Sequence, residues 1–339
     1  RTFAWASEAR GKAHVHVVII GFGCFNLMGK RIYECDGDKI TCEEVRNISP
    51  YLLEGNDVVV MPRNKPLCSV PEMIFGSMPN DGGNLLLSDQ EKTDLVNSEP
   101  QASRWIRPFL GSQEFINSER RWCLWLEEVE PRELRGMPQV LKRVEAVRKV
   151  RSESVRETTR KLAALPTLFG ENRQPKSDYL LVPSVSSERR PFIPIGYLTS
   201  NVIASNLVNI IPDATLYHFG ILTSTMHMAW VRQVCGRLKS DYRYSVKLVY
   251  NNFPWPRLEV GGRTDKAWPL SVRETHINFL MTPYDAGIPQ ETLPPKVVSK
   301  SGLGRDAKKV AAVEAKAQAV LDARARYPLS TLADLYDPL

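Results

Sequence analysis

The chain has 339 residues, of which 43% are hydrophobic and 24% charged, and its formal net charge is +7. This composition is typical of a globular protein large enough for two domains, and it excludes a disordered or collagen-like chain. No apolar run reaches the ~20 residues that a membrane helix needs. The six cysteines are scattered without a CxxC pair, which favours a reducing cytoplasm over a disulfide scaffold or a zinc site. We therefore expect a cytoplasmic protein without a metal site or a membrane partner, and the missing initiator Met suggests a piece of a longer chain.

The N-terminal region is predicted to contain three strands. Residues 14–22 form a short β-branched run that ends at glycine, which predicts a buried strand. Residues 31–40 predict a second strand, interrupted by a turn at Asp36-Gly37. Residues 57–61 predict a third apolar strand, and a loop rich in proline and glycine follows it.

The clearest predicted helix covers residues 137–165, and Pro166 and Gly170 follow its end. Its apolar face consists of Val140, Val144, Val147, Val155 and Leu162. Between Arg132 and Lys161 the chain has ten lysines or arginines against four glutamates. Such a segment is either a solvated amphipathic helix or a helix that contacts the phosphates of a nucleic acid. On the second interpretation, the candidate contacts to the DNA backbone are Lys142, Arg143, Arg148, Lys149 and Arg151.

The second half of the chain is predicted to contain both strands and helices. The predicted elements are strands at 179–183, 192–199 and 241–250 and helices at 225–234 and 307–325. Residues 257–306 are rich in proline and glycine and weakly patterned, which is typical of a linker or an irregular segment.

The sequence has no recognisable self-contained active site. Gly21-Phe22-Gly23 follows an apolar strand, but a dinucleotide-binding loop needs a third glycine and position 26 is Asn, so we interpret the pattern as a turn at the strand end. His218 and His227 have no carboxylate or cysteine nearby at ligand spacing, which favours structural histidines over metal ligands. The P-loop, GxSxG and HExxH motifs are absent.

A segment rich in basic and aromatic residues runs from His218 to Pro256. Within it Lys239, Asp241 and Arg243 alternate along a predicted strand, so their side chains would share one face. A Lys ammonium suits the guanine acceptors O6 and N7, and a carboxylate suits the cytosine N4 amino group, so this face could read DNA bases. The alternative is ordinary strand alternation with a solvated face. The residues expected on the other face, toward the core, are Ser240, Tyr242 and Tyr244.

Several long strings follow one another along the chain in an order that is specific to one protein family. They are Lys65-Pro-Leu-Cys, Gly76-Ser-Met-Pro-Asn-Asp-Gly-Gly-Asn, Arg121-Trp-Cys-Leu-Trp-Leu, Pro183-Ser-Val-Ser-Ser-Glu-Arg-Arg and Tyr250-Asn-Asn-Phe-Pro-Trp-Pro. Together they resemble the target recognition region of MmeI-like DNA methyltransferases, the single-chain type IIL restriction–modification enzymes. The start, from Phe3 to Phe22, resembles the end of their adenine methyltransferase domain, and the tail from Leu321 resembles their C-terminal helical domain.

The resemblance implies a parent enzyme that transfers a methyl group from S-adenosylmethionine to the N6 amino group of an adenine flipped out of double-stranded DNA. The family's cofactor-binding glycine motif and its Asn-Pro-Pro-Tyr/Phe loop are absent here, which implies a chain that neither binds the cofactor nor catalyses alone. Phe3 or Trp5 would stack on the flipped adenine, and packing in the core is the alternative for both. Lys239 and Asp241 would set the base pair beside that adenine, with guanine on the methylated strand.

The resemblance also implies a mixed α/β fold in a prokaryotic cytoplasmic protein. The expected segments are the last strands of a class I methyltransferase sheet (1–49), the DNA target recognition domain (50–256), a linker or irregular segment (257–306) and the start of a C-terminal helical domain (307–339). Two rival hypotheses stay open at this point. The chain could be a nucleic-acid-binding module that never belonged to an enzyme, or its parent could also cleave DNA.

Overall fold

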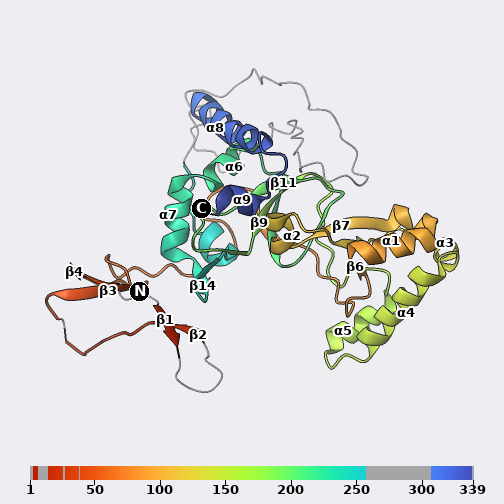
Figure 1. Cartoon of the computed structure of the whole chain (residues 1–339), viewed down its shortest axis with the longest axis horizontal. Coiled ribbons are helices and arrows are strands. Elements are labelled where there is room, and N and C mark those ends of the chain that lie inside the picture. The colour runs from red at the N-terminus through yellow and green to blue at the C-terminus, as the bar shows by residue number, and fades with distance from the viewer. Residues whose placement is uncertain (1–2, 7–13, 26, 38, 257–306, 338–339) are drawn as a thin grey trace.

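The computed structural model describes residues 3–6, 14–25, 27–37, 39–256 and 307–337, and Figure 1 shows their arrangement. They form a mixed α/β fold, as predicted, with several small sheets in place of one large sheet. The predicted linker at 257–306 lies outside the described residues. None of the described helices is both long and apolar enough to cross a bilayer.

Two antiparallel strand pairs make up the N-terminal part. The first pair is β1 (Phe3–Ala6) with β2 (His14–Val17), and the second is β3 (Lys30–Asp36) with β4 (Lys39–Val45). The turn predicted at Asp36-Gly37 is confirmed. Gly37 has a φ of 58°, a conformation that glycine reaches without the steric cost of a Cβ atom.

Two apolar runs of this region differ from the strands that the sequence predicts. The strand predicted over 14–22 ends at Val17, and Ile19 and Ile20 beyond it are exposed, because no second layer of the described structure covers them. The run at 57–61 is irregular and pairs with no strand of the described sheets. Only Val60 of that run packs against the core.

Two four-stranded sheets form the centre of the molecule, one in the order β11-β9-β13-β5 and the other in the order β12-β7-β8-β6. Alternate residues of β9 belong to different clusters: Leu180 and Val182 pack in one and Leu181 in another. The strand is therefore buried on both faces, which explains its continuous apolar sequence. The strands are β5 (Ile74–Phe75), β6 (Leu86–Leu87), β7 (Ile106–Leu110), β8 (Trp122–Leu124), β9 (Tyr179–Pro183), β11 (Gly196–Leu198), β12 (Ile203–Ala204) and β13 (Val208–Pro212).

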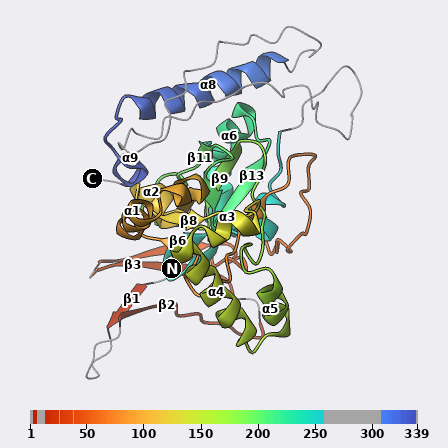
Figure 2. The same cartoon turned by 90° about the vertical axis from the view of Figure 1, so that its right-hand side faces the viewer.

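Short helices surround the sheets. They are α1 (Asp89–Ser98), α2 (Ser112–Asn117), α3 (Pro131–Arg135), α4 (Pro138–Ser152), α5 (Glu157–Lys161), α6 (Leu216–Leu222), α7 (Thr225–Val234), α8 (Ala307–Ala325) and α9 (Leu332–Tyr336). Two 3₁₀ helices cover Pro100–Trp105 and Leu162–Ala164. Helix α8 packs against α6, above it in Figure 2, and a Cβ atom at Gly220 would come within 2.8 Å of Val313. Glycine at this position allows the two helices to approach closely.

The prediction of one continuous helix over 137–165 is wrong, because α4 ends at Ser152 and α5 begins at Glu157. The buried side chain of Arg151 binds carbonyl groups of residues 162, 165 and 168, so it holds the following segment folded back against α4. Val155 lies in the connection and is 95% exposed, so it does not continue the apolar face of α4.

The predictions for the second half of the chain are partly confirmed. Helices α7 and α8 have the predicted ranges, and the Ser224 side chain caps α7 by accepting from the His227 backbone N–H. The strand predicted over 192–199 is shorter and starts at Gly196. The strand predicted over 241–250 ends at Arg243, and a π-helix (Val246–Tyr250) follows it.

Candidate nucleic-acid interface

A β-hairpin carries the three residues that the sequence analysis proposed for base recognition. Strand β14 (Gly236–Leu238) pairs with β15 (Asp241–Arg243), and β15 also pairs with β10 (Val185–Ser186). Leu238 lies opposite Asp241, so Lys239 and Ser240 alone form the connection. In Figure 1 the hairpin lies below α7, at the lower edge of the main body.

Lys239 lies in the turn of this hairpin, so the prediction that it shares one strand with Asp241 and Arg243 is wrong. Its φ of 57° is a left-handed conformation, which reverses the chain direction between the two strands. Asp241 and Arg243 are two residues apart on β15 and do share a face, as predicted. The turn thus places the ammonium-bearing residue next to the strand that carries the carboxylate.

The three candidate side chains differ in their surroundings. Lys239 and Arg243 are exposed, and Asp241 is half-buried. The backbone N–H of Glu188 donates to Oδ1 of Asp241 at 3.3 Å, and Oδ2 has no hydrogen bond or ion pair within the described part of the chain. This arrangement holds the carboxylate in place and leaves one of its oxygens able to accept from a ligand.

The opposite face of β15 anchors the hairpin in the main core, as the sequence predicts for the two tyrosines. Tyr242 and Tyr244 are 4% and 3% exposed. The Tyr244 hydroxyl lies 2.9 Å from Nε2 of His227, and the His227 ring packs edge-on against Phe253. Burial lowers the pKa of His227 to about 3, so the ring is neutral at physiological pH. Ser240, predicted to face the core, lies half-buried in the turn.

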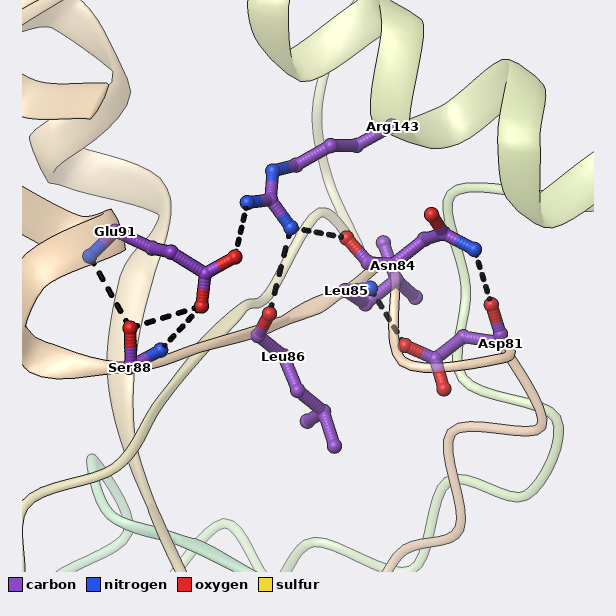
Figure 3. A network of polar contacts seen from close by, with 7 residues as sticks. All are labelled: Asp81, Asn84, Leu85, Leu86, Ser88, Glu91 and Arg143. Atoms are coloured by element: carbon purple, nitrogen blue, oxygen red, sulfur yellow. Dashed lines mark hydrogen bonds and ion pairs between the residues drawn. The ribbon is translucent and has the colours of Figure 1, made fainter. Parts of the chain in front are cut away.

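Two of the five basic residues predicted to contact the DNA backbone are engaged inside the protein. Arg143 forms an ion pair with Glu91 at 2.8 Å and donates to the carbonyl oxygens of Asn84 and Leu86, as Figure 3 shows. Glu91 also accepts from the Ser88 backbone N–H. This hydrogen bond has the largest effect on the pKa of the Glu91 carboxyl group, the one from Arg143 has the next largest, and the pKa is lowered to about 2. Arg143 therefore ties α4 to the start of α1.

The prediction that Arg151 contacts a phosphate is wrong, because its guanidinium is buried. Its five N–H groups donate to five backbone carbonyls at 2.7–3.1 Å, so no donor is left for a ligand. Burial lowers the pKa of this guanidinium, but an arginine keeps its charge at any physiological pH. The acceptors belong to Pro79, Asn80, Leu162, Leu165 and Leu168.

The remaining three basic residues of α4 are available to a ligand. Lys142, Arg148 and Lys149 are exposed, and their side chains form no ion pair or hydrogen bond with the part of the chain that the structure describes. Lys142 and Lys149 lie on the side of α4 opposite its buried stripe, which includes Val140, Val144 and Val147. Arg148 lies at the edge of that stripe, one turn after Val144. The solvated and phosphate-contacting interpretations of this helix both stay open for these three.

The two aromatic residues proposed to stack on a flipped base both lie on β1. Phe3 is half-buried in β1, opposite Val17 of β2. Trp5 lies opposite Val15, and its side chain is outside the described residues. The choice between them as the residue that stacks on a flipped base stays open. No group of His, Cys, Asp or Glu among the described residues could hold a metal ion.

The sequence analysis missed two contacts that shape the hairpin. One is the backbone N–H of Glu188, which binds Asp241. The other is the guanidinium of Arg237, which stacks on Tyr242 and donates to the Ser240 carbonyl. Recognising the two-residue turn at 239–240 in the sequence would have predicted the pairing of Arg237 with Tyr242. Lys-Ser, however, lacks the Asn-Gly or Asp-Gly signature of such turns.

Comparison with known proteins identifies the family. The family described as MmeI, target recognition domain, matches residues 54–257, which is more than half of the chain. The chain belongs to this family. The family described as MmeI, C-terminal domain, matches residues 305–339. The MmeI resemblance inferred from the sequence strings is confirmed.

Two relatives of the MmeI-like chain extend this result. DNA methyltransferase A of Bacillus subtilis (strain 168) is 43% identical over 258 residues, which are 76% of this chain and 29% of that protein. A solved structure of the type IIL restriction–modification enzyme MmeI in complex with DNA matches with a TM-score of 0.82 at 40% identity, covering 100% of this chain and 39% of that chain. The chain therefore spans less than half the length of either relative.

Proposed function

We propose that the chain recognises a short double-stranded DNA site, and that the protein to which it belongs methylates the N6 amino group of an adenine there with S-adenosylmethionine as donor. The observation that carries the proposal is the hairpin. It presents Lys239, Asp241 and Arg243 at the surface and is anchored by buried tyrosines, and it lies inside the segment that matches the MmeI target recognition domain. The solved MmeI relative is in complex with DNA.

The chemistry of the hairpin supports base reading by two residues together. Lys239 supplies an ammonium for the guanine acceptors O6 and N7, and Asp241 has Oδ2 available for the cytosine N4 amino group. The two residues would read the two halves of one G·C pair beside the target adenine, with guanine on the methylated strand. Arg243, on the same face as Asp241, would contact a neighbouring base pair.

Sequence-independent affinity would come from α4. Lys142, Arg148 and Lys149 are exposed cations on one rigid helix, and cations in such an arrangement bind phosphates without regard to base sequence. Arg143 and Arg151 have no part in this proposal, because both are bound to protein groups.

Methyl transfer would depend on residues outside this sequence. The cofactor-binding glycine motif and the Asn-Pro-Pro-Tyr/Phe loop do not occur here, so the chain alone would neither bind S-adenosylmethionine nor methylate DNA. In this proposal residues 1–49 complete a methyltransferase sheet, with Phe3 or Trp5 against the flipped adenine. Residues 50–256 recognise the site, 257–306 link the segments and 307–339 begin a helical domain.

Mapping of methylated adenines tests the proposal. The full-length protein is produced in a host without other adenine methyltransferases, and the host DNA is sequenced by a single-molecule method that detects N6-methyladenine. We expect one short asymmetric motif in which guanine lies beside the methylated adenine. Host DNA without methylated adenine would refute the proposed activity. Because the solved relative is a restriction–modification enzyme, the same protein is also tested for cleavage of unmethylated DNA with Mg²⁺.

A further inference from the structure

The tip of the recognition hairpin has a conformation that needs support. Lys239 has a φ of 57°, and a residue with a Cβ atom adopts this conformation at a steric cost. Such residues persist only where neighbouring groups hold them. If the Lys239 side chain contacts one base pair, the turn must also hold that side chain in one orientation, since hydrogen bonds to bases depend strongly on geometry.

Arg237 contacts the 239–240 turn and the ring of Tyr242. Its Nη1 donates to the Ser240 carbonyl oxygen in the turn at 2.9 Å, and its guanidinium carbon lies 4.0 Å from the centre of the Tyr242 ring. Arg237 and Tyr242 are paired across the two strands. Tyr242 belongs to the same buried cluster as Leu180 and Val182 of β9. A single side chain therefore connects a core-anchored ring with the backbone of the turn.

The same geometry separates Arg237 from the reading face. Strand residues alternate between the two faces of a hairpin, and Arg237 pairs with Tyr242, whereas Asp241 pairs with Leu238 on the opposite face. The guanidinium is directed to the Ser240 carbonyl and the tyrosine ring. Arg237 contacts the turn that carries Lys239 and does not share the face of Asp241 and Arg243.

We propose that Arg237 is a positioning residue for base recognition: it holds the 239–240 turn in one conformation and thereby fixes Lys239 relative to Asp241. This inference rests on the proposed function of the hairpin. A lysine at position 237 would keep the positive charge but lacks the planar face that stacks on Tyr242 and the forked donors that reach the carbonyl. Loss of Arg237 should therefore lower selectivity and leave the general attraction to DNA intact.

The test compares the native full-length protein with its Arg237→Lys variant. Bound duplexes are selected from a pool of random-sequence DNA and sequenced, and affinity for one fixed random duplex is measured separately. We expect the preference at one base-pair position to fall about fivefold or more, the lower end of what one bidentate base contact supplies. Affinity for the fixed duplex should change less than about twofold, because the charge is kept. Hydrogen exchange of the peptide covering 236–244 should become faster.

Arg232→Lys is the matched control, because Arg232 is an exposed arginine of α7 that also donates to a backbone carbonyl, that of Pro191. It should leave the base preference unchanged. An Arg237→Lys variant with native preference and native exchange would overturn the positioning role. So would an Arg237→Gln variant that loses affinity for all duplexes alike with a shallower salt slope, since Arg237 would then contact a phosphate. A native protein that selects no motif at all would refute the proposed function itself.

Discussion

At Arg151 a single side chain joins α4 to two other segments of the chain. Its sequence neighbours are basic, and its residue type predicts an exposed cation, although position 151 continues the helical stripe of Val140, Val144 and Val147. In the structure the guanidinium satisfies five carbonyls from two segments that flank α4, and the helix ends one residue later. Buried carbonyls need donors, and the arginine fork supplies five from one position.

Arg151→Met should lower the free energy of unfolding by about 2–4 kcal/mol, because buried carbonyls would lose their donors. Urea denaturation measures this difference. Arg148→Met is the matched control on the same helix, since Arg148 is exposed, and its effect should stay within about 0.5 kcal/mol. Equal effects of the two substitutions would contradict the structural role of Arg151.

The second residue-scale prediction concerns the specificity of Lys239 and Asp241. The double substitution Lys239→Glu with Asp241→Arg exchanges the donor and the acceptor, so it should replace guanine by cytosine at one position of the methylated motif. Either single substitution should mainly impair recognition, since a wrong contact costs about 1–3 kcal/mol. Methylation-site mapping of the full-length variants is the measurement. An unchanged motif in the double variant would reject the assignment.

At the scale of elements, α4 has a buried face and an exposed basic face. Its valines and Arg151 pack inward, and Arg143 joins it to α1. Lys142, Arg148 and Lys149 are exposed to solvent. A helix fixed at several points holds the backbone of its exposed cations in place, so only their side chains would have to be ordered on binding.

Replacing Lys142, Arg148 and Lys149 by alanine should weaken binding to all duplexes alike. The log–log dependence of affinity on salt should become shallower by about 2–3 units if each residue contacts one phosphate. The matched control removes the same charge from exposed positions of α8 and its end, with Lys308, Lys316 and Arg326 replaced by alanine. An unchanged salt dependence in the α4 variant would show that these three residues are solvated and contact no phosphate.

Helix α7 is joined to the residue that follows β15 by the buried contact between His227 and Tyr244. The pKa of His227 is about 3 in the folded protein, below the usual 6.5, so the unfolded chain binds a proton more readily. The stability that this group contributes is complete above about pH 6.5 and is lost as pH falls toward 3, by up to about 1.4 kcal/mol per pH unit. His227→Gln should reduce this slope in urea denaturation at pH 7, 6 and 5. A slope equal to the native one would contradict the burial of a neutral ring.

At the scale of the whole molecule, helices α8 and α9 are attached to the part of the chain that matches the target recognition domain. Helix α8 packs on α6, and Arg324 at its end donates to the Ile195 carbonyl and lies over the Phe219 ring. The Arg190–Asp337 ion pair adds a second connection, from the loop after β10 to the end of α9. The C-terminal segment is thus joined at several points to the part of the chain that matches the target recognition domain.

Calorimetric titration of the isolated chain with S-adenosylmethionine should give no binding, because the chain lacks the glycine motif and the Asn-Pro-Pro-Tyr/Phe loop. The same preparation should bind double-stranded DNA, which serves as the control for correct folding. Micromolar affinity for the cofactor would show that these residues contain a cofactor site, and the proposed division between segments would then be wrong.

The sequence by itself determined the family, the ranges of helices α7 and α8, strand β9 and the two tyrosines that anchor the hairpin. Each of these depends on a local signal: an ordered string of residues, a capping residue, a helical period or an apolar run buried on both faces. Such signals need only the residues that carry them. The candidate recognition residues were found for the same reason, since they lie close together in sequence.

Only the tertiary structure decided which cations are exposed and how the candidate recognition residues are arranged. Arg151 and Arg143 resemble their exposed neighbours in sequence, but their acceptors lie up to 72 residues away in the chain. The turn at Lys239 lacks a turn signature, and it forms because β15 pairs with both β10 and β14 and Arg237 binds the Ser240 carbonyl. Side-chain availability and turn geometry depend on groups that come together only when the whole chain folds, so local patterns cannot report them.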